Sequence, residues 1–230
     1  MIKEAVILAG GLGIRLRSAV PDLPKCMASV NGKPFLAHVM DHFQKQGIEK
    51  FIFSLGYKHE IIEYFINAEY SDINSQFCIE SEPLGTGGAI TSACSKATEK
   101  SVLIINGDTL FKIDVSKLSV FHNMCGADCT LSLKLMQKFD RYGRVELSED
   151  NSIKKFSEKE YCESGLINGG IYALNVINFL QENLPEKFSF EKDYLEKYFH
   201  ERRIYGVIQD EYFIDIGIPV DYEKAQNELK

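Results

Sequence analysis

The sequence predicts an α/β fold, a three-layer sandwich with a mixed, mostly parallel central sheet. In the first 110 residues, short apolar runs typical of buried strands alternate with helix-like segments, and this alternation indicates parallel strands joined by crossover helices. After residue 110 the alternation loosens, and several strand-like segments stand close enough for antiparallel pairing. Since no repeat, low-complexity segment or linker separates the two halves, we expect them to share one sheet.

The first half is expected to supply the parallel strands and their covering helices. Residues 5–9 form a short apolar run that is closed by glycine, as a buried strand often is. Pro34 fits the first turn of a helix, and Gly47 provides its C-terminal stop. The expected strands are residues 5–9, 50–55, 77–79 and 101–105, and the expected helices are residues 34–46, 60–68 and 85–97.

The second half is expected to add strands that pair antiparallel and three further helices. The expected strands are residues 127–135, 143–147, 153–157, 165–174 and 212–216. The expected helices are residues 176–183, residues 190–201 and a last helix that begins at Pro219.

Composition narrows the class of protein. The 230 residues carry a net charge of −7, which argues against a nucleic acid as the partner. No run approaches the ~18 apolar residues of a membrane helix, and the first residues do not resemble a signal peptide. Six cysteines without a CxxC pair predict reduced thiols in the cytoplasm and no zinc site. His38 and His42 could share one helix face, but no third metal ligand is visible nearby.

A glycine-rich loop follows the first predicted strand. Residues 10–25, GGLGIRLRSAVPDLPK, lie at the carboxyl edge of the sheet, where open α/β sheets bind ligands. They lack the G-K-[ST] of a P-loop, and Leu16 replaces the third glycine of the dinucleotide fingerprint, which argues against a NAD or FAD oxidoreductase. Glycines let backbone N–H groups approach oxyanions, and Arg15, Arg17 and Lys25 add cations. The loop could hold a triphosphate; the alternative is a tight turn with solvent-facing basic residues.

A second glycine-rich loop, EPLGTGG at residues 82–88, also follows a predicted strand. Gly85, Gly87 and Gly88 let the backbone approach something closely. That neighbour could be a ligand, or it could be the sheet against which the next helix packs. The sequence leaves both interpretations open.

Two aspartates end apolar strands. Asp108 follows the fourth predicted strand within NGD, and Asp215 ends the last one within IDIG. A carboxylate in such surroundings is costly unless it is paired or binds a cation. Magnesium favours sites with one or two carboxylates, waters and substrate phosphates. The pair, taken with the basic loop, therefore predicts a magnesium site, although each aspartate alone could be a cap.

Together these elements resemble the nucleotidyltransferases that activate sugar 1-phosphates. The signature of that family is roughly GGxGTRLxPxTxxxPK, and EPLGTGG, NGD and YFIDIG follow it here in the family's order, so the resemblance covers nearly the whole chain. FDRYGR, FSEK, LINGGIY, FSFEKDYL and YFIDIGIPVDY are most similar to the short members that guanylylate D-glycero-α-D-manno-heptose 1-phosphate. Ile14, Val20 and Cys26 depart from the signature.

The resemblance implies a Rossmann-like sandwich of the nucleotide-diphospho-sugar transferase type, formed as one domain by residues 1–230. The nucleotide would bind in the half at about residues 1–110 and the sugar in the half at about residues 111–230. The implied reaction transfers a nucleotidyl group, GMP from GTP by the closer resemblance, to a sugar 1-phosphate with release of pyrophosphate. Mg²⁺ would be the cofactor, and the product would serve surface-glycan biosynthesis. No protein nucleophile is required.

Family positions also imply roles for individual residues. Arg15, Lys25 and Asp108 would be catalytic, and Asp108 and Asp215 would hold the metal. The implied nucleotide-binding residues are Leu8, Ala9, Gly10, Gly11, Gly13, Glu80, Pro83, Gly85, Thr86 and Gly107. The implied residues for the sugar phosphate are Tyr142, Gly143, Glu158, Lys159, Asn168 and Gly169.

The base and the sugar are less well determined. Guanine presents two adjacent donors that one carboxylate can accept, so Glu80 or Glu82 is a hypothesis for guanine preference. Within the family, the alternatives are a mannose-1-phosphate guanylyltransferase and an N-acetylmuramate-1-phosphate uridylyltransferase. A non-catalytic nucleotide-sugar sensor is a remote alternative, expected only if one of the four charged site residues were absent. The sequence leaves the oligomeric state open, a homo-oligomer included.

Overall fold

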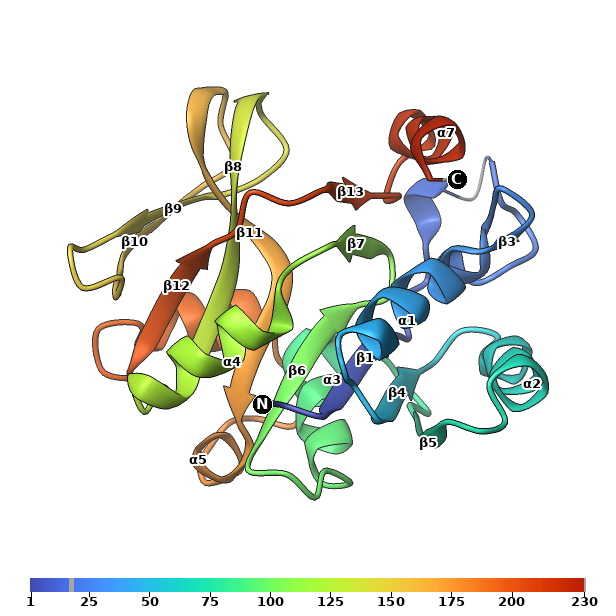
Figure 1. The fold of residues 1–230 in the computed structure, drawn as a ribbon, viewed down its shortest axis with the longest axis horizontal. Helices are drawn as coiled ribbons and strands as arrows, with labels where there is room; N and C mark the ends of the chain where they lie inside the picture. Colours follow the sequence, from blue (N-terminus) through green and yellow to red (C-terminus); the bar gives the residue numbers. More distant parts are fainter. Residues whose placement is uncertain (17–18, 230) are drawn as a thin grey trace.

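The computed structural model describes residues 1–16 and 19–229 and contains a nine-stranded mixed sheet (Figure 1). Its strands are β1 (Glu4–Ala9), β4 (Lys50–Leu55), β5 (Asn74–Ile79), β6 (Ser101–Asn106), β8 (Cys129–Phe139), β9 (Arg144–Leu147), β10 (Ile153–Ser157), β11 (Cys162–Asn175) and β12 (Ile204–Ile208). The strand order is β10-β9-β11-β6-β1-β4-β5, and β8 pairs with both β11 and β12. Strands from both halves of the chain thus belong to one sheet, as expected.

The four strands of the first half are parallel and end together. In the register, Leu8 lies opposite both Ser54 and Asn106, and Leu55 lies opposite Ile79. The loops that follow β1, β5 and β6 therefore meet at one edge of the sheet. This arrangement brings the two glycine-rich loops and Asp108 together, although they are far apart in the sequence.

β11 joins the second half to the first, because it pairs antiparallel with β6 on one side and with β8 on the other. Its pairing with β8 shifts register between Asn168 and Tyr172. A bulge of this kind bends the strand and redirects its side chains. Gly169 and Gly170 consequently lie between the two registers, and Gly170 lies against the Asn106 side chain at the end of β6.

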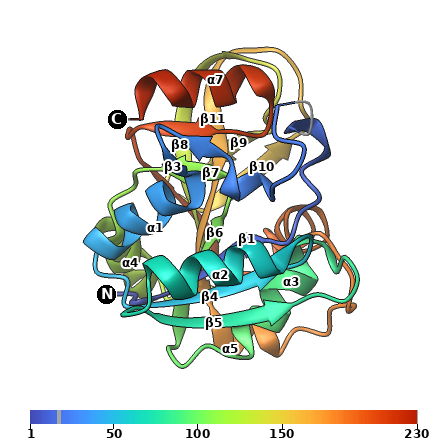
Figure 2. The same cartoon turned by 90° about the vertical axis from the view of Figure 1, so that its right-hand side faces the viewer.

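Helices cover both faces of the sheet, as Figures 1 and 2 show. Side chains alternate between the faces along each strand, so Ala5 and Ile7 belong to one hydrophobic core and Val6 to the other. The helices on the first core are α1 (Phe35–Lys45), α2 (His59–Glu69), α4 (Val115–Met124) and α7 (Pro219–Glu228). The helices on the second are α3 (Gly85–Cys94), α5 (Val176–Leu180) and a π-helix (Phe190–Leu195) followed by α6 (Glu196–Tyr198). The three-layer prediction is confirmed.

Most expected elements are present, and several bounds differ. α3 ends at Cys94 and α5 at Leu180, earlier than expected, and residues 190–201 form the π-helix and α6 instead of one helix. α4 and β12 were not expected. Asp114 caps α4 by accepting from Lys117 N, so a helix-start signal was present in the sequence.

The late strand lies outside the large sheet. β13 (Phe213–Asp215) pairs antiparallel with β7 (Thr109–Phe111) in a separate two-stranded sheet. Another short hairpin consists of β2 (Ser29–Val30) and β3 (Lys33–Pro34). α7 follows β13 and lies at the opposite end of the molecule from α5 (Figures 1 and 2). Within the described ranges, no helix combines the length and apolar character that a bilayer crossing requires.

Candidate active site

A cavity of about 740 Å³ lies at the carboxyl edge of β1 and β6. Every residue expected to bind nucleotide lines it: Leu8, Ala9, Gly10, Gly11, Gly13, Glu80, Pro83, Gly85, Thr86 and Gly107. The three residues expected to be catalytic, Arg15, Lys25 and Asp108, also line it. The parallel register explains this convergence, because it ends the strands before these loops at one level.

The second cavity, of about 640 Å³, adjoins the first. Every residue expected to bind the sugar phosphate lines it: Tyr142, Gly143, Glu158, Lys159, Asn168 and Gly169. Asp215 lines it too, and Arg15, Asn106 and Gly217 line both cavities. Two ligands bound in the two cavities would therefore meet at this shared boundary.

Lys25, Asp108 and Asp215 converge near the boundary. The Lys25 Nζ donates to Asp108 Oδ2 and lies 3.9 Å from Asp215 Oδ1. The Lys25 side chain is only 12% exposed, so solvent screens this cluster weakly. Burial, and then the negative charge of Asp108, raises the pKa of Asp215 above its ordinary value. Two carboxylates thus share one ammonium group.

Local structure holds these three side chains in place. Asp215 lies opposite Thr109 in the β13–β7 ladder, and Ile216 N donates to Asp108 O at 3.0 Å. Gly217 N donates to Asp215 Oδ1 at 2.7 Å. Lys25 begins a 3₁₀ helix whose next two residues, Cys26 and Met27, are buried. The small sheet outside the main one therefore serves to place Asp215 beside Asp108.

The donor set fits a divalent cation. Because Asp108 and Asp215 both reach the Lys25 ammonium group, they are close enough to approach one ion. No cluster of three or more protein ligands occurs among residues 1–16 and 19–229. Magnesium often has only one or two carboxylate ligands and completes its shell with water and substrate phosphate. A cation here would thus depend on the phosphates for further ligands.

The first glycine loop wraps around Lys25. Gly13 has a φ of +59°, and a Cβ on it would lie 3.1 Å from Lys25 Cβ, so both conformation and space favour glycine. Arg15 is exposed at the boundary of the cavities. Arg17 and the side chain of Ile14 lie outside the described part of the chain. The expected triphosphate loop therefore lines a cavity and is not simply a surface turn.

The glycines of the second loop divide between the cavity and close packing, although the packing partner is the segment at residues 186–188 and not the sheet. Gly85 lines the nucleotide cavity. Gly87 and Gly88 are buried, and a Cβ on them would collide with the Phe188 ring and the Glu186 carbonyl, respectively. The last two glycines thus allow α3 to pack against the segment before the π-helix.

Only one of the two glutamates considered for guanine lies in the cavity. Glu80 lines it, accepting from Ser54 Oγ at 2.9 Å and from Leu84 N at 3.2 Å. Glu82 is exposed and is not part of the lining. The fixed Glu80 carboxylate retains lone pairs that could accept from a base.

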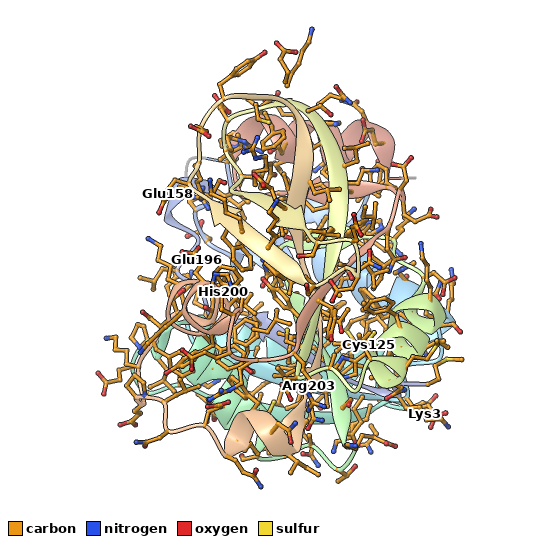
Figure 3. All side chains as sticks on the ribbon, turned by 90° about the vertical axis from the view of Figure 1, so that its left-hand side faces the viewer. Lys3, Cys125, Glu158, Glu196, His200 and Arg203 are labelled. Carbon is orange, nitrogen blue, oxygen red and sulfur yellow. The ribbon has the colours of Figure 1, made fainter. Side chains whose placement is uncertain are left out.

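The sugar cavity is rich in polar and charged groups. Tyr142 OH accepts from Arg141 Nη2 at 3.1 Å, and burial, followed by the charge of Asp215, raises the pKa of Tyr142 to about 12. Glu158 and Glu196 lie on the same side of the molecule (Figure 3). Burial, and then the charge of Glu158, raises the pKa of Glu196. Such a wall offers acceptors and donors for the hydroxyl groups of a sugar.

Several lining residues were not expected from the sequence, namely Asn106, Arg141, Glu191, Lys192 and Gly217. All five stand inside motifs that carried the resemblance, NGD, FDRYGR, FSFEKDYL and YFIDIG. The signal was therefore present, but nothing in a motif distinguishes a lining side chain from a packed one.

Other candidate ligands have structural partners. His38 Nε2 and His42 Nε2 hydrogen-bond to the carbonyls of Val30 and Ile113, respectively. The six cysteines are all free, and burial raises the pKa of the Cys26 thiol to about 12. Val20 packs against the first hydrophobic core.

Comparisons with known proteins give matches over nearly the whole chain. A family model described as nucleotidyl transferase matches residues 4–230. The D-glycero-alpha-D-manno-heptose 1-phosphate guanylyltransferase of Aneurinibacillus thermoaerophilus is 53% identical over 227 residues, covering 99% of this chain and 98% of the relative. The enzyme of the same name from Campylobacter jejuni is 44% identical over 220 residues, covering 95% and 96%. The crystal structure of HddC from Yersinia pseudotuberculosis complexed with GMP-PN has a TM-score of 0.89 at 37% identity and is covered fully, as is this chain.

Proposed function

The chain belongs to the nucleotidyl transferase family, and we propose that it transfers GMP from GTP to D-glycero-α-D-manno-heptose 1-phosphate, with release of pyrophosphate. The observation that carries the proposal is the meeting of two cavities at Arg15, Lys25, Asp108 and Asp215. Relatives of 53% and 44% identity bear the name of this activity over nearly the whole chain, which supports the choice of base and sugar.

In the proposed reaction, an oxygen of the sugar phosphate attacks the α-phosphorus of GTP. The new P–O bond forms as the bond to the β-phosphate oxygen breaks, and pyrophosphate carries away the electron pair. Two anions must approach, so catalysis rests on positioning and on neutralising charge. Lys25 binds near the α-phosphate at the boundary of the two cavities, and Arg15 binds the departing β- and γ-phosphates. Asp108 and Asp215 would hold Mg²⁺, which supplies positive charge to phosphate oxygens.

The second cavity receives the sugar phosphate. Asn168 and Glu158 offer hydrogen-bonding groups to the hydroxyls, and Lys159 offers a cation to the phosphate. The whole chain acts as one nucleotidyltransferase unit, since strands of both halves share the sheet that positions the two cavities. Its free cysteines suit the reducing cytoplasm, where the product would enter surface-glycan biosynthesis.

A substrate matrix tests this function. GTP and UTP are each combined with D-glycero-α-D-manno-heptose 1-phosphate, mannose 1-phosphate and N-acetylmuramate 1-phosphate, and pyrophosphate release is followed with Mg²⁺ and with a chelator. The highest kcat/KM is expected for GTP with the heptose phosphate, and the chelator is expected to stop turnover. A higher kcat/KM for GTP with mannose 1-phosphate, or for UTP with N-acetylmuramate 1-phosphate, would show that the proposed substrates are wrong.

Glu80→Gln tests whether the Glu80 carboxylate recognises guanine. The amide offers one acceptor where the carboxylate offers two, so the preference for GTP over UTP should fall by roughly tenfold or more. The ratio of the two kcat/KM values measures this preference. Glu82→Gln is the matched control, because Glu82 is exposed outside the cavity lining. An unchanged ratio in Glu80→Gln would exclude Glu80 as the guanine ligand.

A further inference from the structure

A chain of side-chain hydrogen bonds links the two cavities at a distance from the metal-binding carboxylates. It begins at Thr86, in the lining of the nucleotide cavity, and ends at Asn168, in the lining of the sugar cavity. Glu191, the second residue of the π-helix, stands between them. Glu191 has no role in the proposed reaction.

The bonds run continuously from one end to the other. Thr86 Oγ1 donates to Glu191 Oε2 at 2.6 Å, and Tyr172 OH donates to Glu191 Oε1 at 3.5 Å. Asn168 Nδ2 in turn donates to Tyr172 OH at 2.9 Å. At the far end, Asn168 Oδ1 accepts from Gly170 N at 3.0 Å, which fixes the bulge of β11. We call Thr86, Glu191, Tyr172 and Asn168 the relay.

The relay runs through well-packed surroundings. Tyr172 is 1% exposed, and its ring lies 5.1 Å from that of the fully buried Phe190. Thr86 Oγ1 also accepts from Phe190 N at 2.9 Å. Burial, and then the charge of Glu191, raises the pKa of Tyr172 well above its ordinary value, so its hydroxyl keeps the proton that it donates. The Tyr172 hydroxyl group, at the buried centre of the relay, therefore lies where a hydrogen bond is stronger than it is in water.

The segment before the π-helix is also joined to the second glycine loop by backbone hydrogen bonds. Gly87 N donates to Phe188 O at 3.0 Å, and Phe188 N donates to Leu84 O at 3.1 Å. These bonds connect the loop at the nucleotide cavity to the chain two residues before the π-helix. Short π-helical segments of this kind are rare and recur at functional sites.

Both oxygens of Glu191 are already engaged by protein groups, since Ser189 Oγ also donates to Oε2, at 3.1 Å. These bonds join the Glu191 carboxylate to Thr86 on α3 and to Tyr172 on β11, so it can position both. We propose that Glu191 is a positioning residue that holds Thr86 and Asn168 in a fixed relative position, so that a change at one cavity alters ligand binding in the other. The proposal rests on the assignment of the cavities to nucleotide and sugar phosphate.

The first test needs no ligand. Amide hydrogen exchange is measured at Gly170 in the wild type, Thr86→Val and Tyr172→Phe. Both variants should exchange faster at Gly170, because each releases Asn168 from the relay. Tyr194→Phe is the matched control: Tyr194 is equally buried in the same aromatic cluster but lies outside the relay. If Thr86→Val does not fold, Glu191→Gln takes its place. Unchanged Gly170 exchange in Thr86→Val or its replacement overturns the relay.

The second test is kinetic. Thr86→Val should raise the KM for the sugar phosphate, and Tyr172→Phe should raise the KM for GTP, each about three- to tenfold, as loss of one hydrogen bond commonly does. In the double variant, the increase in each KM should be smaller than the product of the increases in the two single variants, because both residues act through the same relay. The proposal is contradicted if Thr86→Val raises only the KM for GTP, Tyr172→Phe raises only the KM for the sugar phosphate, and these increases are unchanged in the double variant. If the wild type transfers no GMP, the proposed function fails, and exchange at Gly170 alone decides the relay.

Discussion

Asp108→Ala is expected to lower kcat by roughly a thousandfold or more while leaving the protein folded. The residue is one of two carboxylates that converge at the boundary of the cavities, and its side chain is partly exposed, so its loss opens no cavity in the core. Without it, a cation would have a single protein carboxylate as its ligand, and Lys25 would pair with Asp215 alone. Steady-state pyrophosphate release measures the effect, and cooperative thermal unfolding checks the fold.

Asp41→Ala is the control for that variant. Asp41 also pairs with a lysine, since Lys33 Nζ donates to it at 2.6 Å, but it lines neither cavity. Its removal should leave kcat close to that of the wild type. If Asp108→Ala retained near-normal kcat, the assignment of the reaction centre would be wrong.

Lys25→Ala is the second variant with a large expected effect, again a loss of roughly a thousandfold or more in kcat. The ammonium group lies near the boundary of the two cavities, and no other described cation pairs with both Asp108 and Asp215. Its loss also leaves two partly buried carboxylates without that ammonium group. Mg²⁺ alone should therefore raise the Tm of Lys25→Ala by more than it raises the Tm of the wild type.

Lys33→Ala tests whether loss of any paired lysine has this effect. Its partner Asp41 lies away from both cavities, so neither kcat nor the response of Tm to Mg²⁺ should change. An equal Tm response to Mg²⁺ in Lys25→Ala and the wild type would argue that Lys25 does not compensate a cation site.

The sequence predicts the parallel half of the fold well because β1, β4 and β6 contain apolar runs and end at polar or glycine-rich loops, whereas β5 begins with three polar residues and was expected only at residues 77–79. The common edge of a parallel sheet then places those loops together without knowledge of any contact. The same reasoning brings Asp108 to the first glycine loop. It does not place Asp215, because that residue depends on β13 pairing with β7 outside the main sheet.

Elements whose character depends on distant partners were harder to predict. α4 carries both apolar and polar buried residues, with Leu118 and His122 on its inner face, so its hydrophobic pattern is weak. Glu191 and Thr86 are separated by 105 positions, and only the packing of the π-helix on α3 joins them. The sequence could not separate Glu80 from Glu82 either, since the turn after β5 decides which of them faces the cavity.

The most direct test of the account follows the α-phosphorus itself. The wild type is given GTP labelled with ³²P at the α- or the γ-phosphate, together with D-glycero-α-D-manno-heptose 1-phosphate and Mg²⁺, and the products are separated. The account predicts that the α-label enters the nucleotide sugar and the γ-label leaves as pyrophosphate. Transfer of the γ-label to the sugar, or release of the α-label as free GMP, would contradict nucleotidyl transfer.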